Sequence, residues 1–450
     1  MIRAAPRWSA VRGRTGVFLL AALLASPAAA LVRVPAEPGA LARALDRAPA
    51  GAVLRLAPGR HRGGVRIVRP VAIEGRPGVV VDGRGVGDVL RVAAPGVVIR
   101  GLEIRGSGRD LTAMNAGIFV ERGARGVHIE GNLLDDNLFG VWVDAAPAAT
   151  ILDNRVHGIP DVRSQDRGNG IHLYAVHGAR VEGNEIWETR DGIYIDTSVG
   201  NALRGNFMHD LRYGVHYMYS HDNEVSGNRT RRTRTGYALM QSRGLRVFDN
   251  VSRQDRNYGI LMNFITYSEI ARNRIVGVRP GRAYATGGEA VPGAEGKALF
   301  IYNSQFNDIH DNLLQDADIG IHLTAGSEDN AIHGNSFVFN RTQVKYVASR
   351  SQEWSRNGRG NYWSDYLGWD LDGDGIGDRP YEPNDAVDKL LWKYPVARIL
   401  MNSPGIEILR WVQIRFPVLR PAGVRDSYPL MRPTRPPEPS AAAGAAEGER

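Results

Sequence analysis

The chain of 450 residues contains no cysteine, which excludes a disulfide framework and thiolate metal sites. It also lacks a long apolar run, because the most hydrophobic stretch near its start, residues 17–24, is too short to cross a membrane as a helix. Its histidines lack the HExxH spacing of zinc-dependent proteases. Glycine, in contrast, is abundant, and its 53 copies suit a structure with several tight turns in each repeat.

The N-terminus has the layout of an export signal. Four arginines precede the apolar stretch, and three alanines at 28–30 form a small-residue cleavage site. We expect residues 1–30 to be a cleaved signal peptide, with a signal anchor as the alternative. Its removal takes away four arginines and no acidic residue, so the net charge falls from +8 to +4. The overall basicity is therefore a weak argument for nucleic-acid binding.

A repeat dominates the middle of the chain. Strand-like segments that begin with glycine start at Gly192, Gly214, Gly236 and Gly259, and Gly-Asn or Asp-Asn pairs follow them. The recurring asparagines are Asn132, Asn154, Asn184, Asn206, Asn228, Asn250, Asn273, Asn312 and Asn335, with a step of 22 residues from Asn184 to Asn250. Such a period, with short strands and no helical pattern, predicts an all-β solenoid, a right-handed parallel β-helix with coils of about 22 residues over residues 65–350.

The two ends of the rod differ from the repeat. Residues 31–64 contain a short helical pattern at 41–45 and are expected to form an N-terminal cap. Residues 351–384 hold two Gly- and Asp-rich motifs. Within the segment 385–432, residues 386–401 and 404–414 have the spacing of amphipathic helices, so a small helical C-terminal extension is expected, either as a cap or as a docking segment. The tail 433–450 has a disordered composition.

The period is broken at defined places. The step from Asn154 to Asn184 is 30 residues, which is 8 more than 22, and the step from Asn273 to Asn312 is 39, which is 17 more. Both insertions precede a strand of the Gly-led set, and residues 107–116 look like a third. Because loops on one edge of a solenoid commonly surround its binding face, we expect the Gly-led strands to carry the functional surface.

An arginine column runs beside these strands, at Arg190, Arg212, Arg234 and Arg256. Like charges about 5 Å apart repel one another unless acidic groups or an anionic partner compensate them. One interpretation gives the column local counter-ions in Asp191, Asp210 and Asp255. The other makes it a docking stripe for an acidic partner or an anionic polymer.

A second column contains soft metal ligands. If Ile193, Ile195, Val215 and Tyr217 point inward, alternation directs His172, Tyr194, His216, Met218 and Met240 outward. Thioether and imidazole groups suit Cu(I), so Met218, Met240 and His216 form a candidate copper site. The glycine register predicts that Met262 points inward. Alternatively, the methionines pack under a loop or a partner. His310, His322 and His333 are interpreted as ordinary coil positions.

The sequence DLDGDGIGD resembles a calcium-binding loop. Asp370, Asp372, Asp374 and Asp378 occupy positions 1, 3, 5 and 9, and the Ile376 backbone carbonyl occupies position 7. Position 12 is Tyr381, with Glu382 one residue late, so the bidentate acid of such loops is missing. We predict a Ca²⁺ site here, with a metal-free Asp-Gly turn as the alternative.

Four features occur together between about residue 33 and residue 432. They are GNYWSDY from Gly360, DGDGIGDRPY, the Gly-Asn coils and FPVLRPAGVRDSYPLM at the end. In these features the chain resembles the NosD family of nitrous oxide reductase maturation proteins. The resemblance implies a periplasmic, non-enzymatic protein of denitrification. Such proteins work with an ABC transporter permease and ATPase and with a copper chaperone lipoprotein, and they support assembly of the copper-sulfur centre of the reductase.

Two other functions remain open. Carbohydrate lyases, epimerases and hydrolases share this repeat class, and a polysaccharide-modifying enzyme would need clustered acids or an Arg or Lys base on the outward face. The outward positions of the Gly-led strands are mostly His, Tyr, Ala and Met, with Asp196 as the main acid. A purely structural surface solenoid is the third possibility.

Overall fold

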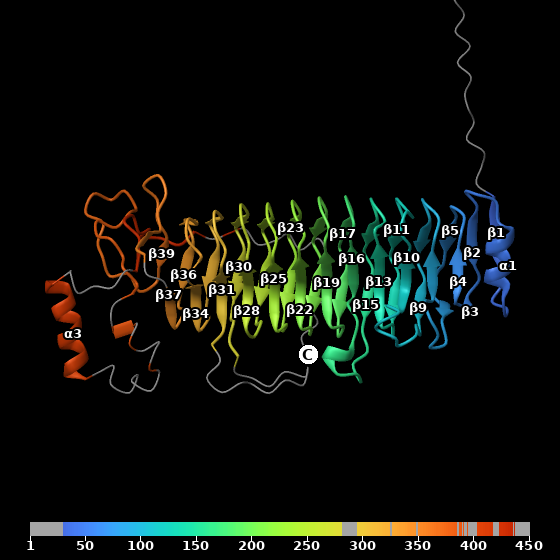
Figure 1. Cartoon of the computed structure of the whole chain (residues 1–450), viewed down its shortest axis with the longest axis horizontal. Helices are drawn as coiled ribbons and strands as arrows, with labels where there is room; N and C mark the ends of the chain where they lie inside the picture. Colours follow the sequence, from blue (N-terminus) through green and yellow to red (C-terminus); the bar gives the residue numbers. More distant parts are fainter. Residues whose placement is uncertain are drawn as a thin grey trace, which may run out of the picture.

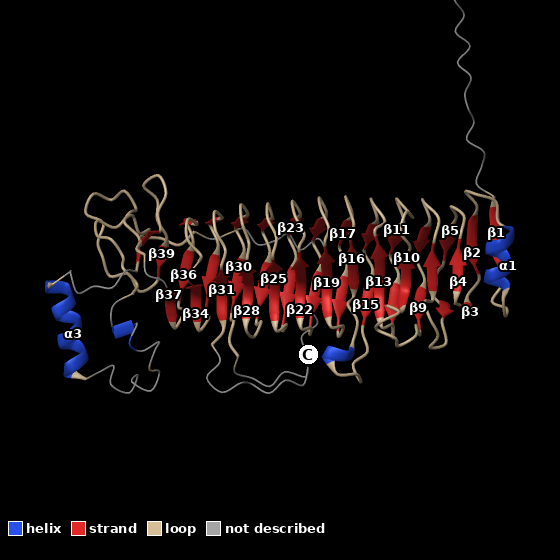
Figure 2. Cartoon of the chain, viewed as in Figure 1, coloured by secondary structure: helices blue, strands red, loops and turns tan. Residues whose placement is uncertain are grey.

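The computed structural model describes residues 30–280, 295–324, 326–347 and 350–384, together with shorter stretches up to residue 436. The predicted signal peptide, most of the expected helix at 386–401 and nearly all of the tail lie outside these residues. The described chain forms a long rod with a helix at each end (Figures 1 and 2).

Three parallel sheets form the walls of this rod, and each coil contributes one strand to each sheet. Sheet A contains β1 (Leu31–Val34), β2 (Val53–Leu56), β5 (Ala72–Glu74), β8 (Val98–Arg100), β11 (His128–Glu130), β14 (Thr150–Leu152), β17 (Arg180–Glu182), β20 (Ala202–Arg204), β23 (Glu224–Ser226), β26 (Arg246–Phe248), β29 (Glu269–Ala271), β32 (Asp308–His310) and β35 (Ala331–His333).

Sheet B contains β3 (Gly59–Arg62), β6 (Val79–Asp82), β9 (Glu103–Arg105), β12 (Leu133–Asp135), β15 (Arg155–His157), β18 (Glu185–Trp187), β21 (Phe207–His209), β24 (Arg229–Arg231), β27 (Val251–Arg253), β30 (Arg274–Val276), β33 (Leu313–Gln315), β36 (Ser336–Val338) and β39 (Tyr362–Trp363).

Sheet C contains the Gly-led strands. Its members are β4 (Val65–Ile67), β7 (Leu90–Val92), β10 (Ala116–Val120), β13 (Phe139–Asp144), β16 (Ile171–Tyr174), β19 (Asp191–Asp196), β22 (Tyr213–Met218), β25 (Thr235–Met240), β28 (Tyr258–Asn263), β31 (Lys297–Tyr302), β34 (Ile319–Thr324) and β37 (Thr342–Val347). The predicted all-β parallel solenoid is confirmed, with about 14 turns of roughly 23 residues.

The glycine that starts these strands has a steric cause. A Cβ atom at Gly192 would lie 2.5 Å from the backbone oxygen of Gly214, and one at Gly214 would lie 2.6 Å from that of Gly236. At these coils the neighbouring backbones therefore approach too closely for a side chain at this position. The next residue points inward, so Ile193 and Val215 stack in register inside the rod with no exposed surface.

A ladder of buried asparagines joins the coils. The backbone N–H and the side-chain amide of Asn184 both donate to Oδ1 of Asn206, at 3.0 and 2.9 Å, and the pattern repeats from Asn132 to Asn361. The ladder ends on Asp426, whose carboxylate accepts a hydrogen bond from the Asn361 backbone N–H at 2.7 Å. Burial raises the pKa of Asp426 to about 6.

Helix α1 (Ala40–Arg47) covers the first coil and buries Leu41 and Leu45, so the predicted N-terminal cap is present. However, β1, β2 and β3 already belong to the sheets, and the coils therefore begin at Leu31 rather than near residue 65. The sequence did not show this because the helix lies between β1 and β2 and interrupts the strand pattern.

At the other end, the rings of Trp354 and Trp363 stack with the ring of Phe337 on the last coils. The short strands β38 (Gln352–Glu353) and β40 (Val424–Arg425) pair in parallel beside them. Helix α3 (Pro404–Arg415) is the expected helical extension. Among the described residues, no helix has the length and apolar character that crossing a membrane requires.

Candidate functional site

The outer face of sheet C carries two side-by-side columns of side chains. The first runs Phe119, Trp142, His172, Tyr194, His216, Ala238, Leu261, Phe300, His322 and Lys345. The second runs Asp144, Tyr174, Asp196, Met218, Met240, Asn263 and Tyr302. His172, Tyr194, His216, Met218 and Met240 thus lie on the outward face, as alternation along the strand predicts.

Part of this face is covered. All three insertions connect sheet B to sheet C, as the spacing predicted. The first two do not merely surround the face, however, because residues from them pack on it. Phe119, Phe139 and Trp142 form an apolar cluster with Ile159, outside the core of the rod, and Trp142 is only 8% exposed. The second insertion contains the short 3-10 helix η1 (Ser164–Asp166).

His172 lies at the boundary of this cover. Its ring centroid is 3.8 Å from that of Trp142 and 4.6 Å from that of Tyr194. Burial lowers the pKa of His172 to about 3, so its imidazole is neutral at physiological pH. The side-chain amide of Asn169 lies 3.1 Å from its Nδ1 atom, and no hydrogen-bond partner reaches Nε2 within the described chain.

The next three coils form what we call the open section of the face, where the side chains of Tyr194, His216, Met218 and Met240 are partly exposed. Met218 and Met240 are direct neighbours in the register of β22 and β25, so their side chains leave the sheet about 5 Å apart. His216 lies two residues before Met218 on the same face. Met262 is fully buried in the core, as its glycine register predicts. His216, Met218 and Met240 are therefore brought together, and Met262 is not part of the group.

A buried carboxylate holds His216 in place. Oδ2 of Asp191 lies 2.9 Å from Nδ1 of His216, and Arg212 makes two hydrogen bonds to the same carboxylate at 2.8 and 2.6 Å. Burial alone would raise the pKa of Asp191, but Arg212 and His216 outweigh it and lower the pKa. An ionised carboxylate needs a donor, so Nδ1 of His216 donates to Asp191, and Nε2 is the ring nitrogen that remains for a metal.

Of the three predicted counter-ions, Asp191 is the one that pairs with the arginine column within the described part of the chain. Asp191 binds Arg212, as expected. Asp210 instead binds Arg232 and His209, and Asp255 accepts hydrogen bonds from hydroxyl groups of Thr230, Thr233 and Ser252. These two assignments were wrong because both side chains turn away from the column toward nearer donors.

Three residues of the outer face were missed or undervalued by sequence reasoning. Lys297 and Lys345 both lie on sheet C, and His322 is in the first column next to Lys345. Burial lowers the pKa of Lys297 and that of His322, the latter to about 3. The strand of Lys297 has alanine where its neighbours have glycine, and it follows the longest insertion. The sequence therefore did not predict that Lys297 points outward. The spacing from Gly320 to His322 was the available signal.

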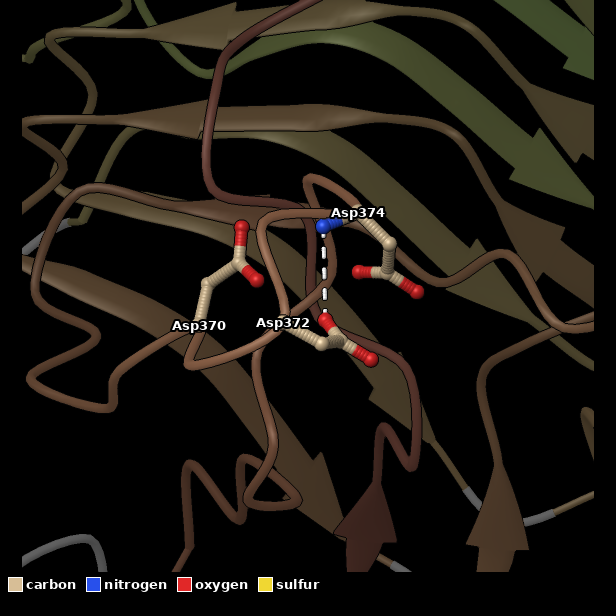
Figure 3. Close-up of side chains that lie close together, drawn as sticks. All are labelled: Asp370, Asp372 and Asp374. Carbon is tan, nitrogen blue, oxygen red and sulfur yellow. Dashed lines mark hydrogen bonds between the residues drawn. The ribbon is translucent and has the colours of Figure 1, made fainter.

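The aspartate loop at the far end has part of the expected geometry (Figure 3). Carboxylate oxygens of Asp370, Asp372 and Asp374 lie within 4.8 Å of one another. Asp378 is outside this group, and its carboxylate accepts a hydrogen bond from the Leu371 N–H at 2.8 Å. No described contact assigns a role to the Ile376 carbonyl.

The acid that should complete this loop is absent from it. The hydroxyl of Tyr381, at position 12, donates to Asp365 at 2.8 Å, and its ring packs on Trp363. Glu382 pairs with Arg425 at 3.2 Å. Neither residue is turned toward the aspartates, so the loop offers three carboxylates and no bidentate ligand.

Comparison with known proteins places the chain in a family. The family model described as "Periplasmic copper-binding protein (NosD)" matches residues 153–368. A protein of Pseudomonas aeruginosa named "Probable ABC transporter binding protein NosD" is 60% identical over 385 residues, which cover 85% of this chain and 89% of that protein. A protein of the same name from Stutzerimonas stutzeri is 55% identical over 379 residues, or 84% and 86% of the two chains.

Solved structures show the fold alone. A PL6 alginate lyase in complex with a trisaccharide has a TM-score of 0.50 and 15% identity, over 74% of this chain and 83% of that chain. The coils, the two C-terminal motifs and the sequence identity over most of both chains lead to one conclusion. The chain belongs to the NosD family.

Proposed function

We propose that this protein is a periplasmic accessory factor in the maturation of nitrous oxide reductase. In this proposal it receives copper on the open section of sheet C and presents it for assembly of the copper-sulfur centre. The observation that carries the proposal is His216, oriented by Asp191, beside the adjacent Met218 and Met240. The description of the family as periplasmic and copper-binding supports it.

The chemistry of these ligands suits a cargo site. Thioether sulfur and neutral imidazole are soft donors that favour Cu(I) over hard cations. They carry no charge, and the chain has no cysteine, so copper would be held without a thiolate. Uncharged donors on an open face allow a metal ion to arrive from one partner and leave to another.

Copper titration tests this site. Replacing Met218 and Met240 with leucine should weaken Cu(I) binding by at least about tenfold, because both thioethers are lost. The Met262→Leu variant is the matched control, since it removes a buried thioether and should bind Cu(I) as the parent does. Unchanged stoichiometry and affinity in the double variant would remove the site. Deletion of the gene should separately leave nitrous oxide reductase inactive if the maturation role is correct.

The partners in this proposal are the ABC transporter, made of a permease and an ATPase, a copper chaperone lipoprotein and the reductase. The names of the relatives support the transporter, and α3 offers a surface for the permease with Ile408 61% and Trp411 55% exposed. Deleting the whole C-terminal segment would also remove Asp426 from the end of the rod. The Ile408→Glu, Trp411→Glu variant is therefore the cleaner test. Loss of co-purification with the transporter is expected, and retained binding would refute docking through α3.

The role is proposed to be non-catalytic, with a polysaccharide-modifying enzyme as the second candidate. Lys297 favours that candidate, because it is a partly buried amine on the outer face and burial lowers its pKa toward the range of a general base. Uronate polymers should show no turnover with the purified protein. Turnover that disappears in Lys297→Met would reverse the assignment.

We also propose that the aspartate loop holds Ca²⁺, on the support of its three clustered carboxylates. With position 12 unfilled, binding should be weak. Calorimetry should detect one Ca²⁺ per chain, and the Asp370→Asn variant should lose it. Absence of heat in the parent chain at millimolar Ca²⁺ would eliminate the site.

A further inference from the structure

The outer face of sheet B changes its electrostatic character along the rod. In the first half, several of its cations have acidic partners. Arg155 pairs with Glu185 at 2.8 Å, and both ring nitrogens of His157 contact carboxylates. This part of sheet B is therefore locally neutralised.

The next coils are different. The outward positions of β24, β27 and β30 hold four arginines, and the register places Arg231 directly beside Arg253. The other two, Arg229 and Arg274, flank Val251 in the neighbouring column. Arg231 and Arg253 are exposed, and neither forms an ion pair with the described part of the chain. Two cations about 5 Å apart without acids between them favour an anionic occupant.

Residues just before the C-terminal tail, Thr434 and Pro436, lie on this sheet. The Thr434 hydroxyl donates to the Gly334 carbonyl at 2.6 Å, and the Ser336 hydroxyl donates to the Thr434 carbonyl at 2.9 Å. Two residues later, the carbonyl of the buried Pro436 accepts a hydrogen bond from Arg274 at 3.1 Å. The chain therefore moves from β36 to β30, toward the arginines of β27 and β24.

Residues 437–450 follow, and they contain Glu438, Glu447 and Glu449 with a single cation, Arg450. Fourteen residues can extend over about 46 Å, whereas β24 is only two coil steps, or about 10 Å, beyond β30. The segment is long enough and has the complementary charge. Its attachment at Pro436 raises its effective concentration at the surface, so individually weak surface ion pairs suffice.

We propose that the outer face of sheet B over β24, β27 and β30 is a docking surface whose occupant is the chain's own C-terminal segment, residues 437–450. The segment continues the contact made by residues 433–436 and places its glutamates beside Arg231 and Arg253. This surface is separate from the copper ligands on sheet C, and the proposal does not depend on the proposed function.

A distance measurement between two spin labels on the full chain tests this. Because the chain has no native cysteine, Ser440→Cys and Leu133→Cys introduce the only two labelling sites. Leu133 lies on β12, in the column that leads to Arg229. At low salt we expect a narrow distance distribution. A broad distribution there would overturn the proposal.

Charge reversal and salt supply the specific readouts. Arg231→Glu with Arg253→Glu should abolish the narrow distribution. Arg125→Glu with Arg243→Glu makes the same charge change at exposed turns between sheets C and A and should preserve it. If the reversal variant does not fold, high salt on the parent chain provides the same test, since screening should broaden the distribution. A narrow distribution that survives charge reversal or high salt would refute docking through these arginines.

Discussion

The covered and open sections of sheet C have the same backbone arrangement but different outward side chains. Under the first two insertions the outward residues are Phe119 and Trp142, which pack with loop residues into a second apolar cluster. Three and four coils beyond Trp142, the same columns hold His216, Met218 and Met240, which are partly exposed. A parallel β-helix offers the same outward positions at every coil, so function depends on where loops leave them accessible. The open section is where soft ligands and a buried carboxylate coincide.

The largest expected effect lies in the covered section. Replacing Trp142 with alanine removes its ring contacts with Phe119, Phe139 and His172, and should cost about 3 kcal/mol of stability. Thermal unfolding should therefore shift to a lower temperature, whereas Cu(I) affinity should change little. A variant that loses copper binding while keeping its unfolding temperature would show that the two sections are not separate.

The next largest effect concerns the carboxylate under His216. In the Asp191→Asn variant the charged acceptor for Nδ1 of His216 is lost, and Cu(I) affinity should fall by about tenfold or more. Asp210→Asn is the matched control, because Asp210 holds His209 and Arg232 in a similar way on sheet B. Equal losses of copper affinity in both variants would mean that general destabilisation is the cause.

The smallest effect tests a histidine outside the open section. Burial alone would lower the pKa of His157, but its hydrogen bonds to Glu188 and Asp135 outweigh burial and raise it. The stabilisation by the charged ring is therefore complete below about pH 6.5 and is lost as pH rises through the raised pKa. The unfolding temperature of the parent should exceed that of His157→Gln by more at about pH 6 than at about pH 9. An equal difference at both pH values would contradict the charge assignment.

These histidines also show how a structural residue differs from a candidate ligand. Both ring nitrogens of His157 are engaged by carboxylates, which leaves no lone pair for a metal. In His216 only Nδ1 has such a partner, and Nε2 is left to face the open section. The sequence cannot separate the two cases, since each histidine simply follows a residue of inward orientation.

Much of the fold follows from the sequence because its determinants are local and periodic. Gly192 and Asn184 each contact only the neighbouring coils, and the same residue types recur at each step. The inward position of Met262 could be predicted for the same reason. In the site, alternation was sufficient to place His216, Met218 and Met240 on one face.

What the sequence left undetermined depends on contacts between distant segments. The cover over Trp142 requires Ile159 to fold back from an insertion, which no period describes. The Asp255 carboxylate accepts hydrogen bonds from nearby hydroxyl groups, so it is not the counter-ion of the arginine column that the sequence predicted. Lys297 follows an insertion that shifts the register, and its outward position became visible only in three dimensions.

The asparagine ladder gives the rod a direction as well as a length. At each step the backbone N–H and one side-chain N–H donate toward the C-terminal end, whereas the other side-chain N–H donates to a carbonyl of the preceding coil. The last asparagine therefore needs a group that accepts hydrogen bonds and does not have to donate onward. The carboxylate of Asp426 meets this need, since it accepts from Asn361 and from the indole N–H of Trp363 at 2.8 Å. The stack thus has a defined terminus that is supplied from 65 residues further along the chain. The final coil is satisfied only when this later segment has folded back onto it.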